Sequence, residues 1–149
     1  YKSASRVVRI FGIDPKVAFL SHSNFGQPIK SITKHIRDAV DILKSMKVDF
    51  KFDGDMQPDV ALSEEYRDLY PFSEIVGKAN ILVMPGQHSA AIAYKIMKTL
   101  GGAKVIGPLL IGLGRAIEIV PLRSSTSEIL NLASVAAYSA NVINYGKVN

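Results

Sequence analysis

The sequence contains no cysteine and no tryptophan, and only 8% of its residues are aromatic. The absence of cysteine excludes disulfide bonds and thiolate metal sites, and it fits a protein of the reducing cytoplasm. No apolar run reaches the roughly 18 residues that a membrane-spanning helix needs, and no signal peptide is visible. We therefore expect a cytoplasmic protein with no membrane partner.

The sequence also lacks a concentration of charge. Lysine and arginine number 18 against 13 aspartates and glutamates, which gives a net charge of +5, but the basic residues are scattered from Lys2 to Lys147. Nucleic-acid-binding domains cluster their basic residues on one face, so we expect no nucleic-acid partner. The modest positive charge favours anionic ligands.

The chain has 149 residues, of which 48% are hydrophobic, and this suits one compact α/β domain with a sizeable core. It opens on tyrosine, not methionine, and we expect it to be a piece of a longer protein.

Apolar periodicity predicts alternating strands and helices. Strands are expected over 16–21, 48–53 and 80–85, and helices over 29–46, 88–102 and 126–145. Two more short strands are expected within 103–120. The alternation predicts an α/β fold with a mostly parallel sheet flanked by helices. The first helix should bury a stripe formed by Ile29, Ile32, Ile36, Ala39, Ile42, Leu43 and Met46.

Two groups of acidic residues look structural. Ser125 and Glu128 match a capping box at the start of the last helix, in which each side chain accepts a backbone N–H of the other's turn. Asp53, Gly54 and Asp55 could form an acid/base pair, a metal site or a turn. A metal site would require three or more clustered ligands, and only two carboxylates are supplied locally. We favour a turn, with Asp59 capping a helix that continues to Leu69.

Four stretches carry a family resemblance: "PKVAFLSHSNFG" (15–26), "DGDMQPDVAL" (53–62), the run 77–113 that begins "GKANILVMPGQHSA", and "SSTSEILNLA". In this order and spacing they resemble the C-terminal half of phosphate acetyltransferases, over essentially all of residues 1–149. This family moves an acetyl group between phosphate and coenzyme A. The resemblance implies an α/β fold like that of the isocitrate and isopropylmalate dehydrogenases, with the active cleft between two domains.

The resemblance breaks at the residues that perform the family's chemistry. Active members carry a motif like "KPVNDLSRGCSVEDIVN", in which a Ser-Arg pair serves acyl transfer and an Asp is placed as a base. Pro121 and Leu122 stand at the Ser-Arg positions, and Glu128 stands at the Asp position. Proline and leucine side chains cannot donate hydrogen bonds to an oxyanion or pair with a phosphate. We expect no catalytic residues in this chain.

A second family shares both the motifs and the losses. The large bacterial NADP-dependent malic enzymes join a malic enzyme module to a C-terminal phosphotransacetylase-like domain. "SNFG" (23–26), Met56-Gln57 and Ile111 resemble this second family. It implies an oligomeric regulatory domain, a dimer or larger, that senses acetyl-coenzyme A or a related acyl-coenzyme A. NADP and a divalent metal would bind in the N-terminal module of the parent. This fragment would bind no cofactor and no metal. Two alternatives remain: the C-terminal fragment of an active phosphate acetyltransferase, and a purely structural oligomerisation domain.

Candidate ligand-binding residues follow the expected strands, because ligands of open α/β sheets bind outside the carboxyl ends of strands. The loop 21–26 could hold a phosphate or an acyl oxygen with backbone N–H groups, although it could also be a plain turn. Its neighbours at the sheet edge would be loops 54–57, 85–88 and 112–115. The candidates are Ser21, Ser23, Asn24, Gly26, Gly54, Gln57, Gln87, His88 and Arg115. His22 and His35 are expected at the surface.

Overall fold

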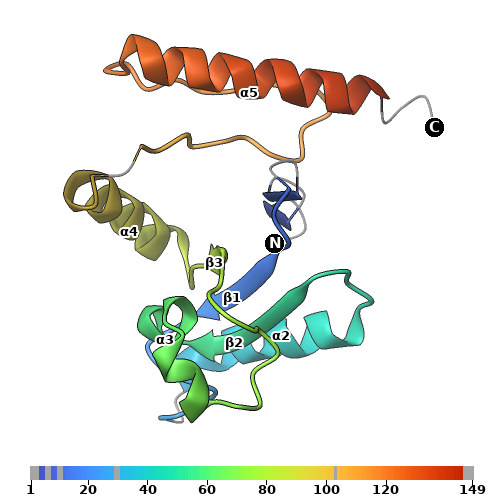
Figure 1. The fold of residues 1–149 in the computed structure, drawn as a ribbon, viewed down its shortest axis with the longest axis vertical. Coiled ribbons are helices and arrows are strands. Elements are labelled where there is room, and N and C mark those ends of the chain that lie inside the picture. Colours follow the sequence, from blue (N-terminus) through green and yellow to red (C-terminus); the bar gives the residue numbers. More distant parts are fainter. Residues whose placement is uncertain (1–3, 6–7, 10–11, 29–30, 103, 146–149) are drawn as a thin grey trace. The chain divides into compact units, whose positions relative to one another are not determined.

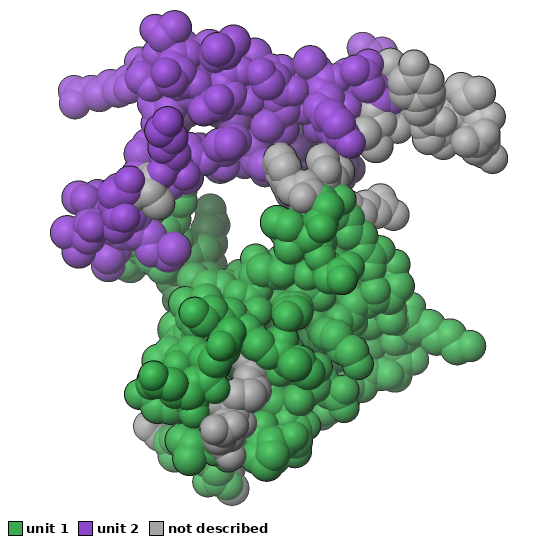
Figure 2. Space-filling model, viewed as in Figure 1, with its two compact units in different colours: residues 1–95 green, residues 96–149 purple. Residues whose placement is uncertain are grey.

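The structure is a computed structural model, which describes residues 4–5, 8–9, 12–28, 31–102 and 104–145. The chain divides into two compact units, residues 1–95 and residues 96–149 (Figure 2). Each unit is described by itself below.

The first unit is built on a three-stranded sheet (Figure 1). Its strands are β1 (Lys16–Leu20), β2 (Lys51–Met56) and β3 (Ile81–Val83), in the order β2-β1-β3. Both neighbours run parallel to β1. The predicted α/β class with a parallel sheet is therefore confirmed. The second strand begins three residues later than expected, and this shift changes the interpretation of the acidic residues within it.

Helices cover both faces of this sheet, because the side chains of β1 alternate between two cores. Val17 and Phe19 pack with the helix α2 (Lys34–Ser45). Ala18 and Leu20 pack on the other face, against the helix α3 (Pro58–Leu62) and the chain that follows it.

The helix α2 is preceded by a 3₁₀ turn, η1 (Ser31–Thr33), and its buried stripe differs from the predicted one. The buried residues of α2 are Ile36, Val40 and Leu43, whereas Ile42 is 63% exposed. The stripe therefore follows the spacing i, i+4, i+7 from Ile36. Ile29 and the side chain of Ile32 lie outside the described part of the chain.

The prediction of a helix from Asp59 to Leu69 is wrong in two respects. The helix α3 ends at Leu62, and a separate 3₁₀ helix, η2 (Glu65–Leu69), follows it. Gln57 is the N-cap residue, with Pro58 in the first turn. Asp59 lies inside that turn, and its carboxylate accepts the N–H of Val60. A proline at the first helical position fixes the start of the helix two residues earlier than an Asp59 cap would.

Two long helices account for most of the chain after the sheet. The helix α4 (Gln87–Leu100) begins in the first unit and ends in the second, and α5 (Thr126–Tyr145) lies wholly in the second. Both confirm the sequence prediction. As expected, α4 stops at Gly101-Gly102, where Gly102 has a φ of 59° and the N–H of Gly101 donates to the Met97 carbonyl. Within the described residues, no helix is long and apolar enough to cross a membrane.

The described part of this range, residues 104–120, forms neither of the two additional strands expected within 103–120. The described residues 104–125 contain no strand and follow an irregular path, drawn in yellow-orange to orange in Figure 1. A strand exists only when a neighbouring strand accepts its ladder of hydrogen bonds. Apolar side chains along this segment are exposed: Ile106, Leu110, Ile111, Leu113, Ile117, Ile119, Val120 and Leu122.

Candidate functional site

Asp53, Gly54 and Asp55 lie inside the strand β2, so the predicted turn is wrong. Both carboxylates are buried, Asp53 at 5% and Asp55 at 0% exposure. Gly54 has a φ of 150°, and a Cβ atom placed there would lie 2.6 Å from the carbonyl oxygen of Phe19. Only glycine allows β2 to approach β1 this closely. Asp-Gly dipeptides are typical of turns, and this local preference is overridden here by the sheet.

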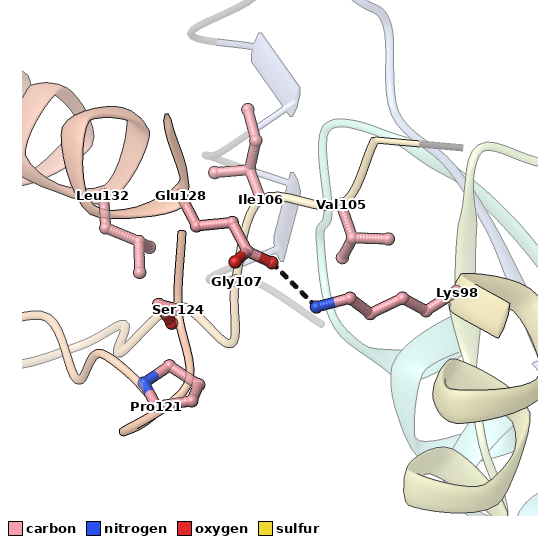
Figure 3. Close-up of a pocket in the computed structure, with 8 residues that line it drawn as sticks. All are labelled: Lys98, Val105, Ile106, Gly107, Pro121, Ser124, Glu128 and Leu132. Carbon is pink, nitrogen blue, oxygen red and sulfur yellow. Dashed lines mark hydrogen bonds and ion pairs between the residues drawn. The ribbon is translucent and has the colours of Figure 1, made fainter. Parts of the chain in front are cut away.

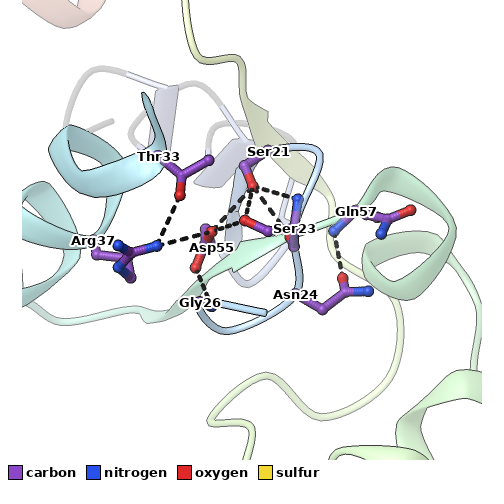
Figure 4. Close-up of polar contacts among 8 residues, drawn as sticks. All are labelled: Ser21, Ser23, Asn24, Gly26, Thr33, Arg37, Asp55 and Gln57. Atoms are coloured by element: carbon purple, nitrogen blue, oxygen red, sulfur yellow. Dashed lines mark hydrogen bonds and ion pairs between the residues drawn. The ribbon is translucent and has the colours of Figure 1, made fainter. Parts of the chain in front are cut away.

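The carboxylate of Asp55 is the centre of a polar network at the carboxyl ends of β1 and β2 (Figure 4). Its Oδ1 accepts the N–H of Gly26 at 2.9 Å. Its Oδ2 accepts the hydroxyl of Ser23 and lies 3.1 Å from the hydroxyl oxygen of Ser21. The guanidinium of Arg37 lies 3.9 Å from Oδ2 and supplies the opposite charge. A buried carboxylate is tolerated when donors and a cation surround it in this way.

Arg37 and Thr33 are members of this network that the sequence analysis did not single out. Arg37 Nη1 donates to Thr33 Oγ1 at 2.7 Å, across one turn at the start of α2. The sequence contains one signal for Arg37: it directly follows the buried Ile36 on an amphipathic helix. A long cationic side chain at the edge of an apolar stripe often serves a buried partner, but the sequence does not say which one.

The loop after β1 is also joined to the start of α3. Asn24 Oδ1 accepts the N–H of Gln57 at 2.7 Å (Figure 4). Since Gln57 is the N-cap residue of α3, Asn24 connects the loop 21–27 to that helix. Asn24 and Gln57 are both half-buried residues.

Six of the nine candidate residues therefore meet at one edge of the sheet. They are Ser21, Ser23, Asn24, Gly26, Gly54 and Gln57. Ser23 and Gly26 are buried, so these two face the protein interior. Gln87 and His88 are exposed and form the start of α4, shortly after β3. Arg115 is exposed and belongs to the second unit. A ligand contact by any of the nine stays a prediction.

A metal centre would require histidine or acidic side chains to lie close together. His22 and His35 are exposed, as predicted. Among the residues that the structure describes, no group of three histidine, aspartate or glutamate side chains could hold a metal ion.

The second unit contains a pocket (Figure 3). Pro121 and Glu128, two residues that differ from the family motif, are among those that line it. It is lined by Lys98, Val105, Ile106, Gly107, Pro121, Ser124, Glu128 and Leu132. Pro121 contributes a ring that offers no hydrogen-bond donor.

The family resemblance aligns Glu128 with the Asp of the motif, and the carboxylate of Glu128 is engaged in two ways. The predicted capping box is confirmed: Glu128 Oε2 accepts the N–H of Ser125 at 2.8 Å, and Ser125 Oγ accepts the N–H of Glu128 at 3.3 Å. Glu128 Oε1 also accepts Lys98 Nζ at 2.8 Å. The Lys98 contact and then the Ser125 hydrogen bonds lower the pKa of Glu128 to about 2. A carboxylate with so low a pKa is a poor proton acceptor near neutral pH.

The sheet is parallel, and polar loops follow the carboxyl ends of its strands. Open α/β sheets of this kind commonly bind ligands at that edge. The family model for Phosphate acetyl/butaryl transferase matches residues 1–137, and the chain belongs to this family.

Solved structures confirm the fold. A phosphotransacetylase from Streptococcus pyogenes matches with a TM-score of 0.85 at 34% identity. EutD phosphotransacetylase from Staphylococcus aureus matches with a TM-score of 0.83 at 29% identity. Each match covers 93% of this chain, and 42% and 43% of the two solved chains respectively. The implied likeness to isocitrate and isopropylmalate dehydrogenases stays a prediction.

Curated relatives confirm both resemblances. An NADP-dependent malic enzyme from Rhizobium meliloti is 43% identical over 139 residues, and one from Escherichia coli is 36% identical over the same length. A phosphate acetyltransferase from Clostridium acetobutylicum is 31% identical over 139 residues. The chain spans 18% of each malic enzyme and 42% of the acetyltransferase. It is therefore homologous to the phosphotransacetylase-like part of NADP-dependent malic enzymes and to phosphotransacetylases.

Proposed function

We propose that the chain is a regulatory domain of an NADP-dependent malic enzyme, which senses acetyl-coenzyme A or a related acyl-coenzyme A and does not transfer acetyl groups. The parent would oxidise and decarboxylate malate to pyruvate, with NADP and a divalent metal bound in its N-terminal module. The greater identity to malic enzymes than to acetyltransferases supports this parent.

The main support for the proposal comes from Pro121, Leu122 and Glu128, which stand at the three positions where the family performs catalysis. Pro121 and Leu122 supply no donor to a developing oxyanion, and such donors carry much of the catalysis of acyl transfer. Glu128 is engaged by Ser125 and Lys98, so it is not poised to take a thiol proton. The polar network around Asp55 lies at the sheet edge. This edge offers polar groups for the proposed ligand binding, whereas Pro121 and Leu122 offer none for acyl transfer.

An oligomer of two or more chains is part of the proposal. On the helix α5, Leu130 is 66% exposed, and Ile129 and Tyr138 are each 48% exposed. Exposed apolar surface of this kind usually marks an interface. Multi-angle light scattering should show the full-length protein as a dimer or larger at micromolar concentration, and a monomer would contradict this part of the proposal.

The regulatory role is tested on the full-length protein. The rate of malate oxidation should change when acetyl-coenzyme A is added, because an effector shifts an equilibrium only through its different affinities for two states. Coenzyme A without the acetyl group is the matched control for the acyl specificity. An unchanged rate at saturating acetyl-coenzyme A would support the alternative of a purely structural domain.

A further inference from the structure

Loops that hold phosphate do so with backbone N–H groups that have no other acceptor. Among the residues 21–27, every one of these groups except the N–H of His22 is already used in the described structure. The five N–H groups from Ser23 to Gln27 donate, in order, to Ser21 Oγ, Gln27 O, Asp55 O, Asp55 Oδ1 and Asn24 O, at distances of 2.5–3.0 Å. A phosphate at this loop would have to break these bonds.

The charged groups next to the loop do not favour the binding of a phosphate either. Asp55 is fully buried and lies directly under the loop, where it accepts from Ser23 and Gly26. The nearby cation, Arg37, is held by Asp55 and by Thr33 Oγ1. Its charge therefore offsets an internal carboxylate, and a second anion would compete for the same guanidinium.

Two neutral groups remain at the outer side of the network. Asn24 Oδ1 accepts the N–H of Gln57, and this bond identifies Nδ2 as the outward donor of the Asn24 amide. Within the part of the chain that the structure describes, neither Asn24 Nδ2 nor the side-chain amide of Gln57 makes a hydrogen bond. Both side chains are half-buried, and Asn24 is held in place by the network beneath it.

We infer that the loop 21–27 contacts an uncharged, amide-bearing part of the ligand through Asn24 and Gln57, and that it does not hold a phosphate. This inference rests on the proposed function, since it concerns the same site. An acyl-coenzyme A has two chemically different halves: a pantetheine arm with two amides, and an adenosine 3′,5′-bisphosphate. A side-chain amide offers one donor group and one acceptor, which match the C=O and N–H of a ligand amide. The structure assigns the pantetheine arm to this loop.

The test compares two probes on the full-length protein by isothermal titration calorimetry: acetyl-coenzyme A, and adenosine 3′,5′-bisphosphate alone. Asn24→Asp removes the outward donor but keeps an acceptor for the Gln57 N–H. Gln57→Ala removes a side chain without internal hydrogen bonds in the described part, so it should fold normally. Each variant should weaken acetyl-coenzyme A binding by about 5- to 10-fold, the loss of one or two hydrogen bonds. Neither should change the affinity for the bisphosphate.

Asn80→Asp is the matched control. It makes the same substitution near the opposite end of β1, where Asn80 bonds Lys16 and Asp14, and it should leave both affinities unchanged. If the loop variants weaken both probes equally, the loop holds the phosphate half and the inference is overturned. It is also overturned if Gln57→Ala and Asn24→Asp bind acetyl-coenzyme A like the wild type. If the wild-type protein binds neither probe, the proposed function itself fails, and the inference falls with it.

Discussion

The two compact units differ in where their apolar side chains lie. In residues 1–95, β1 sends side chains into a core on each face of the sheet. In residues 96–149, Leu132 is the only buried apolar side chain among those that the structure describes. Both units have similar sequence signals: apolar runs, glycine loops and helical spacing of apolar residues. The difference shows that local contacts are enough to form helices and caps. A strand and its core require other strands and helices that are far away in the chain.

The largest expected difference between the units is in the stability lost when a glycine with positive φ is replaced by alanine. Gly54→Ala would place a Cβ against the Phe19 backbone in the first unit. We expect it to lower the free energy of unfolding by about 3 kcal/mol, from backbone strain and steric overlap. In the second unit, Gly112 has a φ of 90° and no atom within 4 Å of its would-be Cβ. Gly112→Ala should cost only ~1 kcal/mol.

Urea unfolding of the two full-length glycine variants measures this contrast. Equal losses of stability would show that the close approach of β2 to β1 is not what requires Gly54.

The second contrast compares two leucines on helices. Leu43 on α2 is 1% exposed, and Leu100 at the end of α4 is 81% exposed. Leu43→Ala should destabilise the full-length protein by about 2–3 kcal/mol because it leaves a cavity. Leu100→Ala should change its stability by no more than ~0.5 kcal/mol. A shift in the urea midpoint for Leu100→Ala as large as for Leu43→Ala would mean that the end of α4 is covered in the intact protein.

The third prediction concerns a purely local signal in the second unit. Ser125→Ala removes the hydroxyl that accepts the Glu128 N–H. We expect a loss of about 1 kcal/mol, typical of an N-cap serine. Thr126→Ala, one residue further along, is the matched control. Far-UV circular dichroism during urea titration would follow the helix, and indistinguishable unfolding curves for the two variants would remove the structural role of the capping box.

The smallest expected effect is a dependence on pH. Because the pKa of Glu128 is lowered in the folded state from 4.5 to about 2, its contribution to stability is fully present above about pH 4.5. This contribution is lost as the pH falls from 4.5 towards 2. Glu128→Gln should therefore lower the urea midpoint at pH 6 and have less effect at pH 3. An equal effect of the substitution at both pH values would contradict the low pKa.

Local patterns predicted much of the fold. The strand β1 and the helices α4 and α5 were expected from apolar spacing and glycine stops, and the capping box from the four residues of its own turn. The missing strands in 103–120 show the limit of this approach. Apolar alternation indicates a capacity to pair, but no local pattern reports whether a partner strand is present.

The candidate site shows a second limit. Asp55 was assigned to a turn because it follows an Asp-Gly pair, yet it lies in β2 and accepts donors from a loop about thirty residues earlier in the chain. The family motifs located Ser23 and Gly26 at the correct sheet edge. They did not show that these residues face inward, because orientation depends on the buried carboxylate and on Arg37.

We propose that the chain binds its ligand at the sheet edge of the first unit and that it performs no acyl transfer. The most direct test measures the formation of acetyl-coenzyme A from acetyl phosphate and coenzyme A by the purified full-length protein. Our account predicts no turnover above the uncatalysed background, because Pro121 and Leu122 replace the family's Ser-Arg pair and Glu128 is held by Ser125 and Lys98. Turnover above that background, abolished when the same preparation is heat-denatured, would contradict the account and identify the chain as part of an active phosphate acetyltransferase.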